Sequence, residues 1–313
     1  MKIIGLSMIK NESDIIESFV RINLRVVDEL HIVDDGSIDR TVEIIRHLRD
    51  EGLNVNVFTF PKHSLDFQQQ SLLMTSLLKQ LSDKEWDYAV FLDADEFILA
   101  ERDNFEADLV STTESHYGLM QLLTYVPISS DYFNCPDPLH ELFRPRPHER
   151  PFYKVVVPRG LASDVLIWPG NHSAARNNEI PRSEAHRLGK TRLAHVPVRS
   201  ANQIVSKALV GAHTLSLKKN RQPGEGTHWD YIAKTIREKA YELDLADLQE
   251  IAFGYTENDR VNLARELQQS PLIPSVGKLK YVLESSALTI RAMDDLLMDV
   301  CHRYASLQRP SDA

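Results

Sequence analysis

The first hundred residues alternate short apolar runs with stretches of helical periodicity. Four runs have the length and β-branched content of buried strands: 2–9, 27–33, 53–60 and 88–92. Three stretches between them repeat apolar residues at helical spacing: 14–25, 41–50 and 68–81. Ser13 is placed to cap the first helix. This order predicts an α/β fold with a mainly parallel sheet flanked by helices.

Three of the predicted strands end in polar or acidic turns. These turns are Lys10-Asn11-Glu12, Asp34-Asp35-Gly36 and Asp93-Ala94-Asp95. The carboxyl ends of parallel strands meet at one edge of a sheet, where ligands bind. Helix capping would explain an acid such as Asp39, but it explains Asp34 and Asp93 less well. The sequence therefore predicts a binding site at this edge.

The Asp93-Ala94-Asp95 turn interrupts two apolar runs. Asp93 and Asp95 are two residues apart, so an extended chain places both carboxylates on one face. Acids enclosed by apolar segments at 88–92 and 97–99 need a compensating cation. Carboxylate oxygens suit Mg²⁺ or Mn²⁺, especially an ion that already holds a diphosphate. An acidic surface turn is the alternative.

A strand is predicted at 118–126, and an irregular segment follows it. Five prolines between 127 and 147 exclude a regular helix there. Long irregular segments inside compact domains are usually functional, so we interpret this one as the acceptor side of a site. Its candidate bases are Asp131, Asp137 and Glu141. We favour Glu141, because the apolar residues around it would desolvate the carboxyl group and raise its pKa.

Two histidines follow in contrasting settings. His172 comes after an aromatic turn, and His195 ends a short apolar strand. Ser200 is placed to cap the next helix, and Arg199 and Lys207 lie close to that cap. A helix N-terminus with two basic side chains is a suitable cradle for a diphosphate.

The chain becomes polar and helical after about residue 212. Helices are predicted at 231–245, 246–253 and 288–307, after an exposed linker at 218–228. We therefore divide the chain into a nucleotide-binding catalytic domain, 1–215, and a helical C-terminal extension, 216–313. We expect the extension to pack on the sheet or on another subunit. Whether the protein forms a homo-oligomer through these helices stays open.

Composition excludes several classes of partner. The 313 residues carry a net charge of −9 without a long basic run, which argues against binding to nucleic acid or anionic membranes. Cys135 and Cys301 match no zinc spacing and no disulfide framework, so we expect a reducing, cytoplasmic location. The N-terminus lacks the features of a signal peptide, and no stretch reaches the ~18 apolar residues of a membrane span.

The three turns together resemble a known family. Lys-Asn-Glu at 10–12, Val-Asp-Asp-Gly-Ser-Ile-Asp at 33–39 and Leu-Asp-Ala-Asp-Glu-Phe at 92–97 are similar to family 2-type glycosyltransferases with the GT-A fold. The subgroup with Asp-Ala-Asp-Glu-Phe is the most similar. The resemblance covers residues 1–100 well and extends less surely to 215. It implies a nucleotide-sugar donor, Mn²⁺ or Mg²⁺, a glycan or other hydroxyl acceptor, and inversion at the transferred sugar.

The resemblance also implies roles for individual residues. Asp95 would ligate the metal and so take part in catalysis, while Asp93 would face the ribose or the metal. His195, or else His172, would complete the metal shell. Arg199 and Lys207 would neutralise the phosphates. The nucleoside would be held by Lys10, Asn11, Glu12, Asp34 and Asp35, with Gln69 at its border.

Two other functions stay open. A nucleotidyltransferase uses a similar sheet, but it usually carries a glycine-rich phosphate loop where this chain has Lys10-Asn11-Glu12. A catalytically silent protein that binds a glycan or nucleotide is the other alternative. The intact Asp93, Asp95 and His195 weigh against it.

Overall fold

The computed structural model describes most of the chain. The described residues are 1–59, 67–112, 116–147, 151–176, 185–216, 221, 224–255 and 266–282. The helix predicted at 288–307 and part of the linker predicted at 218–228 lie outside these residues. None of the described helices is both long and apolar enough to cross a membrane.

Nine strands of the described residues form one sheet. Its order is β3-β2-β1-β4-β8-β6-β11-β5, with β7 paired to β6. The first strands are β1 (Ile3–Ile9), β2 (Glu29–Asp34), β3 (Val55–Thr59), β4 (Tyr88–Phe91) and β5 (Glu96–Leu99). The later ones are β6 (Tyr117–Pro127), β7 (Phe143–Pro145), β8 (Tyr153–Pro158) and β11 (Ala185–His195). A separate hairpin consists of β9 (Val165–Ile167) and β10 (Ala174–Arg176).

The strand directions bring distant segments to one edge. Strands β1 to β4 are mutually parallel, as predicted, so β1, β2 and β4 end at the same edge. The rest of the sheet is mixed. β8 runs antiparallel between β4 and β6, and β11 is parallel to β6 but antiparallel to β5. The C-terminal end of β11 and the N-terminal end of β8 therefore also lie at this edge.

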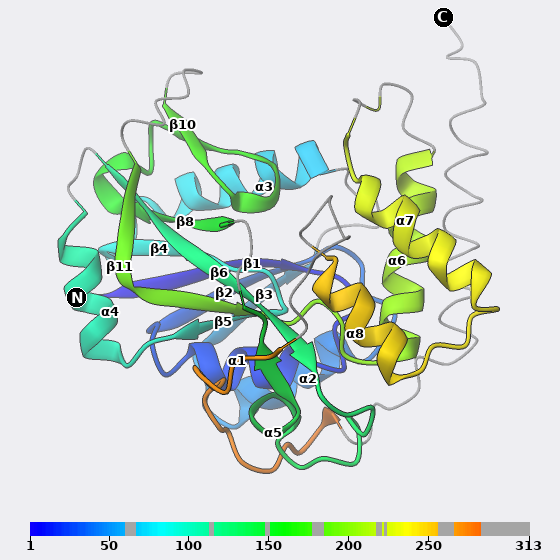
Figure 1. Ribbon diagram of the computed structural model, residues 1–313. Coiled ribbons are helices and arrows are strands. Elements are labelled where there is room, and N and C mark those ends of the chain that lie inside the picture. The colour runs from blue at the N-terminus through cyan, green and yellow to red at the C-terminus, as the bar shows by residue number, and fades with distance from the viewer. Residues whose placement is uncertain are drawn as a thin grey trace, which may run out of the picture.

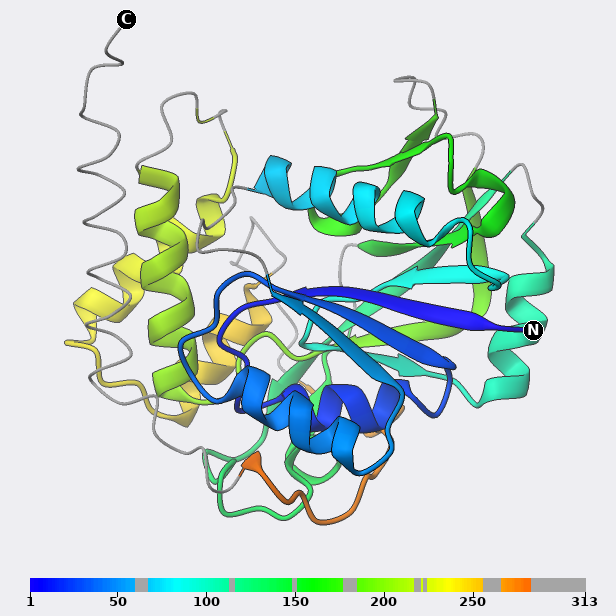
Figure 2. The ribbon, with the colours of Figure 1, turned by 180° about the vertical axis from the view of Figure 1, so that it is seen from behind.

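Helices cover both faces of the sheet (Figures 1 and 2). They are α1 (Ile16–Asn23), α2 (Thr41–Asp50), α3 (Phe67–Leu81), α4 (Arg102–Val110), α5 (Pro138–Glu141), α6 (Ala201–Ser216), α7 (Thr227–Glu238) and α8 (Leu245–Phe253). Helices α1, α2 and α4 share one apolar core with the sheet, and α3 packs in a second core on the opposite face. Both faces of the strands are buried, which explains their continuous apolar runs. The predicted α/β class with flanking helices is confirmed.

The start of α1 differs from the prediction. The helix begins at Ile16, and Ser13 does not cap it. The backbone N–H of Ser13 instead donates to Asp39 Oδ2 at 3.0 Å, so the turn after β1 is fastened to the turn after β2. A long-range bond replaces the local cap that the sequence suggested.

Helices α6, α7 and α8 form a third core beside the sheet (Figure 1). Trp229 of α7 lies against Gly211 of α6, where a Cβ atom would be only 2.8 Å from its ring. Arg146 donates to the carbonyl of Phe253 at 2.6 Å, and this bond fastens α8 to the end of β7. The helices beyond residue 215 thus pack against α6 and the sheet. The domain boundary near 215 stays a prediction.

Residues 271–282 cross the bottom of the molecule as an irregular strap (orange in Figure 1). The buried carboxylate of Glu17 in α1 accepts hydrogen bonds from the backbone N–H groups of Lys280 and Tyr281, at 2.8 to 3.1 Å. At the other end of the strap, Asp137 Oδ2 accepts bonds from the hydroxyl of Ser275 and from the amide of Val276. The strap therefore connects α1 with the segment that carries α5.

Replacing Glu17 by Ala is expected to lower the free energy of unfolding by about 1–3 kcal/mol, because the Nε–H of Arg21 and two strap amides lose their acceptor. Urea denaturation measures the change. Glu43→Ala is the matched control, since Glu43 is half exposed and pairs across the surface of α2 with Arg40 and His47. Equal losses in the two variants would show that the bonds from Glu17 to the strap contribute nothing.

Candidate functional site

The turn after β1 (residues 10–13, the N-terminal turn) is bonded to the turn after β2 (residues 34–41, the Gly36 turn). Asn11 adopts a left-handed conformation with φ of 55°. Its backbone N–H donates to Ser37 Oγ at 2.9 Å, and its side-chain oxygen accepts from the N–H of Ile38 at 2.8 Å. The N–H of Glu12 donates to Thr41 Oγ1 at 2.8 Å. The structure thus brings together the first two predicted turns.

Asp34 and Asp35 begin the Gly36 turn. Asp34 is buried, and both of its carboxylate oxygens accept from the N–H of Ser37, at 3.1 and 3.2 Å. Asp35 is half-buried and faces Lys10, with 3.7 Å between Oδ2 and Nζ. Gly36 has a φ of 78°, which permits the sharp bend. Asp34 therefore shapes this turn, and each of its oxygens retains a second lone pair for a ligand.

Asp95 lies against residues from the C-terminal half of the chain. The N–H of Val196 donates to the Asp95 carbonyl at 2.8 Å, which sets His195 beside Asp95. His195 Nε2 is 3.9 Å from Asp95 Oδ1. Lys207 of α6 donates to Asp95 Oδ2 at 2.7 Å and lies 3.7 Å from Glu12. The predicted group of Asp95, His195 and Lys207 is thus assembled in the structure, beside the N-terminal turn.

Burial and charge fix the protonation states of these groups. Burial disfavours ionisation of Asp95, but Lys207, His195 and Arg199 together outweigh it and hold the pKa of Asp95 below its usual value. Burial lowers the pKa of His195 to about 4. The imidazole is therefore neutral at pH 7 and has a lone pair available for a ligand.

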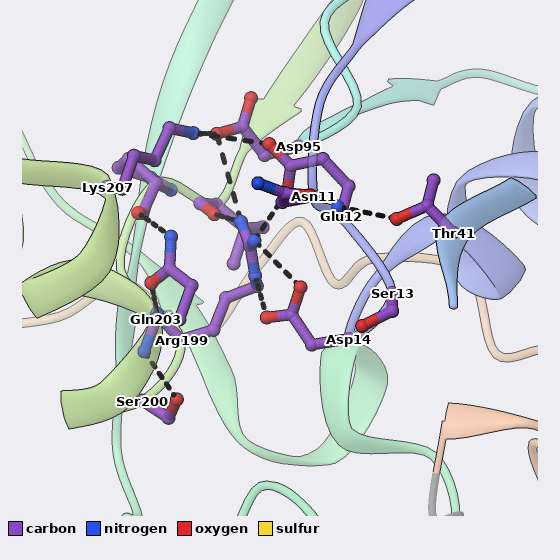
Figure 3. Close-up of polar contacts among 12 residues, drawn as sticks. Asn11, Glu12, Ser13, Asp14, Thr41, Asp95, Arg199, Ser200, Gln203 and Lys207 are labelled. Atoms are coloured by element: carbon purple, nitrogen blue, oxygen red, sulfur yellow. Dashed lines mark hydrogen bonds and ion pairs between the residues drawn. The ribbon is translucent and has the colours of Figure 1, made fainter. Parts of the chain in front are cut away.

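Arg199 is the centre of the buried charges (Figure 3). Its side chain is 1% exposed and donates to both oxygens of Asp14, at 2.6 and 3.0 Å, and to Glu12 Oε2 at 2.6 Å. Asp95 Oδ2 lies 3.9 Å away. Because carboxylates already surround the guanidinium, the geometry does not support the prediction that Arg199 neutralises the donor phosphates. It connects the N-terminal turn with the start of α6.

Asp93 is separated from Asp95 and has its own partners. Lys154 Nζ of β8 donates to Asp93 Oδ2 at 2.5 Å, and Asn171 Nδ2 lies 3.5 Å from Oδ1. His172 is next in the chain, and its Nδ1 is 2.9 Å from the carbonyl of Tyr153. Of the two candidate histidines, His195 has a ring nitrogen 3.9 Å from a carboxylate of the Asp-Ala-Asp turn, whereas His172 feels the charge of Asp93 without an ion pair among the described residues.

The residues at Asp95 fit a divalent cation only in part. The described residues contain no group of three or more His, Cys, Asp or Glu side chains placed to hold a metal ion by themselves. His195 offers a neutral ring whose buried Nδ1 has no hydrogen-bond partner among these residues. Asp95 and His195 are therefore a two-ligand set, which suits an ion that takes its other ligands from bound phosphates and water.

The acceptor-side segment corrects one prediction. Glu141 ends α5 with an exposed side chain, so its apolar neighbours do not desolvate it. Asp137 is buried and serves the strap, whereas Asp131 is exposed and accepts from Asn134 at 2.6 Å. The argument that favoured Glu141 as the base is therefore wrong. Gln69 lies near the start of α3, and its side chain is outside the described residues.

Sequence reasoning missed several residues of this site. Lys154 could have been noticed as a single charge in the run Tyr-Lys-Val-Val-Val-Pro. Asp14 was assigned only to a helix. Tyr255 gives no sequence signal, yet its ring meets His195 edge to face with 5.5 Å between centroids. The helices after residue 215 thus contribute directly to the surroundings of His195.

Comparison with protein families agrees with the first part of this site. Residues 8–103 match the family described as Glycosyl transferase family 2. The match includes the N-terminal turn, the Gly36 turn and the Asp-Ala-Asp turn, so the predicted resemblance to a family 2 glycosyltransferase domain is confirmed over this part of the chain. No curated protein sequence matches the chain.

Two solved structures show weak similarity to the fold. GalNAc-T7 in complex with UDP, GalNAc and Mn²⁺ has a TM-score of 0.40 and 13% identity, over 82% of this chain and 58% of that one. The mannosyltransferase PcManGT from Pyrobaculum calidifontis, in complex with GDP-Man and Mn²⁺, has a TM-score of 0.39 and 13% identity, over 98% and 88% of the two chains. This chain thus spans less than two thirds of the GalNAc-T7 chain.

Replacing Arg199 by Met is expected to lower the free energy of unfolding by about 3–5 kcal/mol, because two buried carboxylates lose their cation. The double variant Arg199→Met/Asp14→Asn should recover part of this loss, since it removes one of the unpaired charges. Arg221→Met, at the more exposed pair with Asp230, is the control and should lower the free energy of unfolding much less. Similar losses for the two arginine variants in urea denaturation would contradict a central role for Arg199.

Proposed function

We propose that this protein is a metal-dependent glycosyltransferase of the GT-A type. It moves a sugar from a nucleotide-diphosphate sugar to an acceptor hydroxyl, with inversion. The observation that carries the proposal is the meeting of three turns from the family-matched segment with His195 and Lys207 at one edge of the sheet. The family match supplies the chemistry, and the later residues complete the site.

The nucleoside is placed at the joined N-terminal and Gly36 turns. Asp34 and Asp35 present carboxylate oxygens there, and Lys10 lies within 3.7 Å of Asp35. Carboxylates accept hydrogen bonds from ribose hydroxyls and from base N–H groups, and such charge-assisted bonds are strong. Asn11 links the two turns through its backbone and its side chain, so the two turns are joined without a ligand.

The diphosphate is placed near Lys207. The side chain of Lys207 is 29% exposed and lies at the inner end of the site, between Asp95 and Glu12. Its ammonium can turn toward a phosphate while it remains close to these acids. Asp95 and His195 would hold a divalent cation, which neutralises the negative charge of the leaving diphosphate.

The acceptor is placed on the side of α5 and the strap. Tyr132 from the proline-rich segment donates through its hydroxyl to the carbonyl of Asp14 at 2.9 Å, which fastens this segment to the N-terminal turn. The exposed acids Asp131 and Glu141 belong to the same segment. This arrangement supports an acceptor that reaches the site beside the nucleoside-binding turns.

Calorimetry with UDP and with GDP, each with and without Mn²⁺, tests the proposal. One nucleoside diphosphate should bind, and Mn²⁺ should increase its affinity. The intact nucleotide sugars then show whether a sugar is transferred. A protein that binds neither diphosphate under either condition would not be a nucleotide-sugar enzyme. Formation of a nucleotide sugar from a nucleoside triphosphate and a sugar phosphate, with release of pyrophosphate, would favour a nucleotidyltransferase.

Asp95→Ala should abolish the increase in affinity that Mn²⁺ gives to the preferred nucleoside diphosphate. A loss of roughly 10- to 100-fold accompanies even indirect damage to a metal site, so losing a ligand should cost at least as much. Asp95→Asn keeps the shape of the side chain and should behave similarly, which separates loss of charge from loss of packing. Unchanged Mn²⁺-dependent affinity in both folded variants would contradict a metal role for Asp95.

Asp34→Ala should weaken binding of the nucleoside monophosphate, UMP or GMP, whichever the wild-type protein prefers. The expected loss is about 1.5–3 kcal/mol, the value of a hydrogen bond to a charged group. Asp34→Asn is the control for the Gly36 turn, because its amide oxygen can still accept from Ser37. Equal affinities of wild type and Asp34→Ala would mean that the nucleoside lies elsewhere.

A further inference from the structure

Lys154 is a fully buried cation that the function proposed above does not use. Its side chain is 0% exposed in β8. The ammonium donates to Asp93 Oδ2 at 2.5 Å and to the carbonyl of Gly170 at 2.8 Å, and it lies 3.3 Å from Glu96 Oε1. The three donors of a lysine ammonium thus face three oxygen acceptors.

The topology explains how Lys154 reaches Asp93. Strand β8 runs antiparallel to β4, with Tyr88 opposite Pro158 and Val90 opposite Val156. The next inward-facing position toward the start of β8 therefore lies beside the residues that follow β4. Lys154 occupies this position, at the edge of the sheet where the Asp-Ala-Asp turn begins.

Packing alone does not require a charge at this position. A buried ammonium costs several kcal/mol unless charged or polar partners compensate it, and an apolar residue of similar length would fill the same volume. Of its two carboxylate partners, Glu96 is buried with it, with a side chain 1% exposed, whereas the side chain of Asp93 is 46% exposed. Glu96 Oε2 accepts from the backbone N–H of Asp93 at 3.0 Å. Lys154 and Glu96 therefore both fix the Asp-Ala-Asp turn.

The two acids of the turn thus have different kinds of cation. Asp95 pairs with Lys207, which is partly exposed and extends from a helix. Asp93 pairs with Lys154, which extends from a strand of the sheet and whose side chain is fully buried. Lys207 can leave Asp95 for another anion, whereas Lys154 is enclosed and is also held by Glu96 and by the carbonyl of Gly170, so it stays beside Asp93.

We propose that Lys154 is a positioning residue that fixes Asp93 for the hydroxyl groups of the nucleoside and keeps it away from the divalent cation. The cation is then held by Asp95 and His195 alone among the predicted ligands. The inference rests on the proposed function for the identity of the nucleoside. The part of the inference that concerns the cation rests on the contacts of Lys154 and Asp93 and does not depend on the proposed function.

The test uses Lys154→Met in the full chain and measures two affinities. Affinity for UMP and GMP without metal should fall roughly 10- to 100-fold, because Asp93 loses the bond that orients it. Affinity of the nucleotide-free protein for Mn²⁺, followed by the electron paramagnetic resonance signal of the free ion, should rise. The released Asp93 carboxylate becomes a ligand beside Asp95. A loss of structure would lower both affinities, so opposite signs identify positioning.

Two double variants control the test. Lys154→Met/Glu96→Gln removes a buried acid together with its cation, so it should fold even where the single variant does not, and it should show the same two changes. Lys154→Met/Asp93→Asn should lose the gain in Mn²⁺ affinity, because the released ligand is no longer a carboxylate. Urea denaturation of each variant establishes that it is folded.

Two results would overturn the inference in a folded variant. One is unchanged affinity for the nucleoside monophosphate that the wild type binds. The other is unchanged or lower affinity for Mn²⁺. If the wild type binds neither UMP nor GMP, the proposed function fails, while the Mn²⁺ measurement still decides whether Lys154 keeps Asp93 from the cation.

Discussion

The buried contact of Arg199 with Asp14 and Glu12 is the interaction on which the arrangement of the site depends. It joins the turn after the first strand to the start of α6, almost two hundred residues later in the chain. A guanidinium without exposure to water requires well-placed carboxylates, and a shift of either element would leave a charge unpaired. Because α6 also carries Lys207, this contact sets the distance between the N-terminal turn and Lys207.

Pairing of buried charges also explains how several acids can lie close together at this site. Four buried carboxylates near the edge of the sheet have a basic side chain from the later part of the chain: Arg199 for Asp14 and Glu12, Lys207 for Asp95, and Lys154 for Glu96. The family-matched segment, 8–103, supplies the acids, and residues 154–207 supply the bases. The buried charges of each part are therefore neutralised by the other part. The family match covers the part that supplies the acids.

This division also explains what the sequence could predict. The strands β1, β2 and β4 and their acidic turns follow from local apolar runs, and parallel pairing alone brings the turns together. The positions of Lys154 and Tyr255 depend on antiparallel register and on packing between distant helices, which no local pattern encodes. Arg199 was identified, but its role was not, since a cation near a helix start fits a phosphate and a buried carboxylate equally well. The desolvation argument for Glu141 was wrong, because apolar neighbours in sequence do not bury a side chain at the end of a one-turn helix.

Under the proposed function, the different freedom of the two lysines has a consequence for how donor and ion bind. Lys207 and a divalent cation compete for the same carboxylate, Asp95, because the ammonium lies 2.7 Å from Oδ2. A diphosphate attracts Lys207 and thereby frees Asp95, so the donor favours the ion and, by linkage, the ion favours the donor. Lys154 takes no part in this exchange, because it remains paired with Asp93 when donor and ion bind. The site thus separates a fixed side at Asp93 from an exchangeable side at Asp95, although only one alanine lies between them.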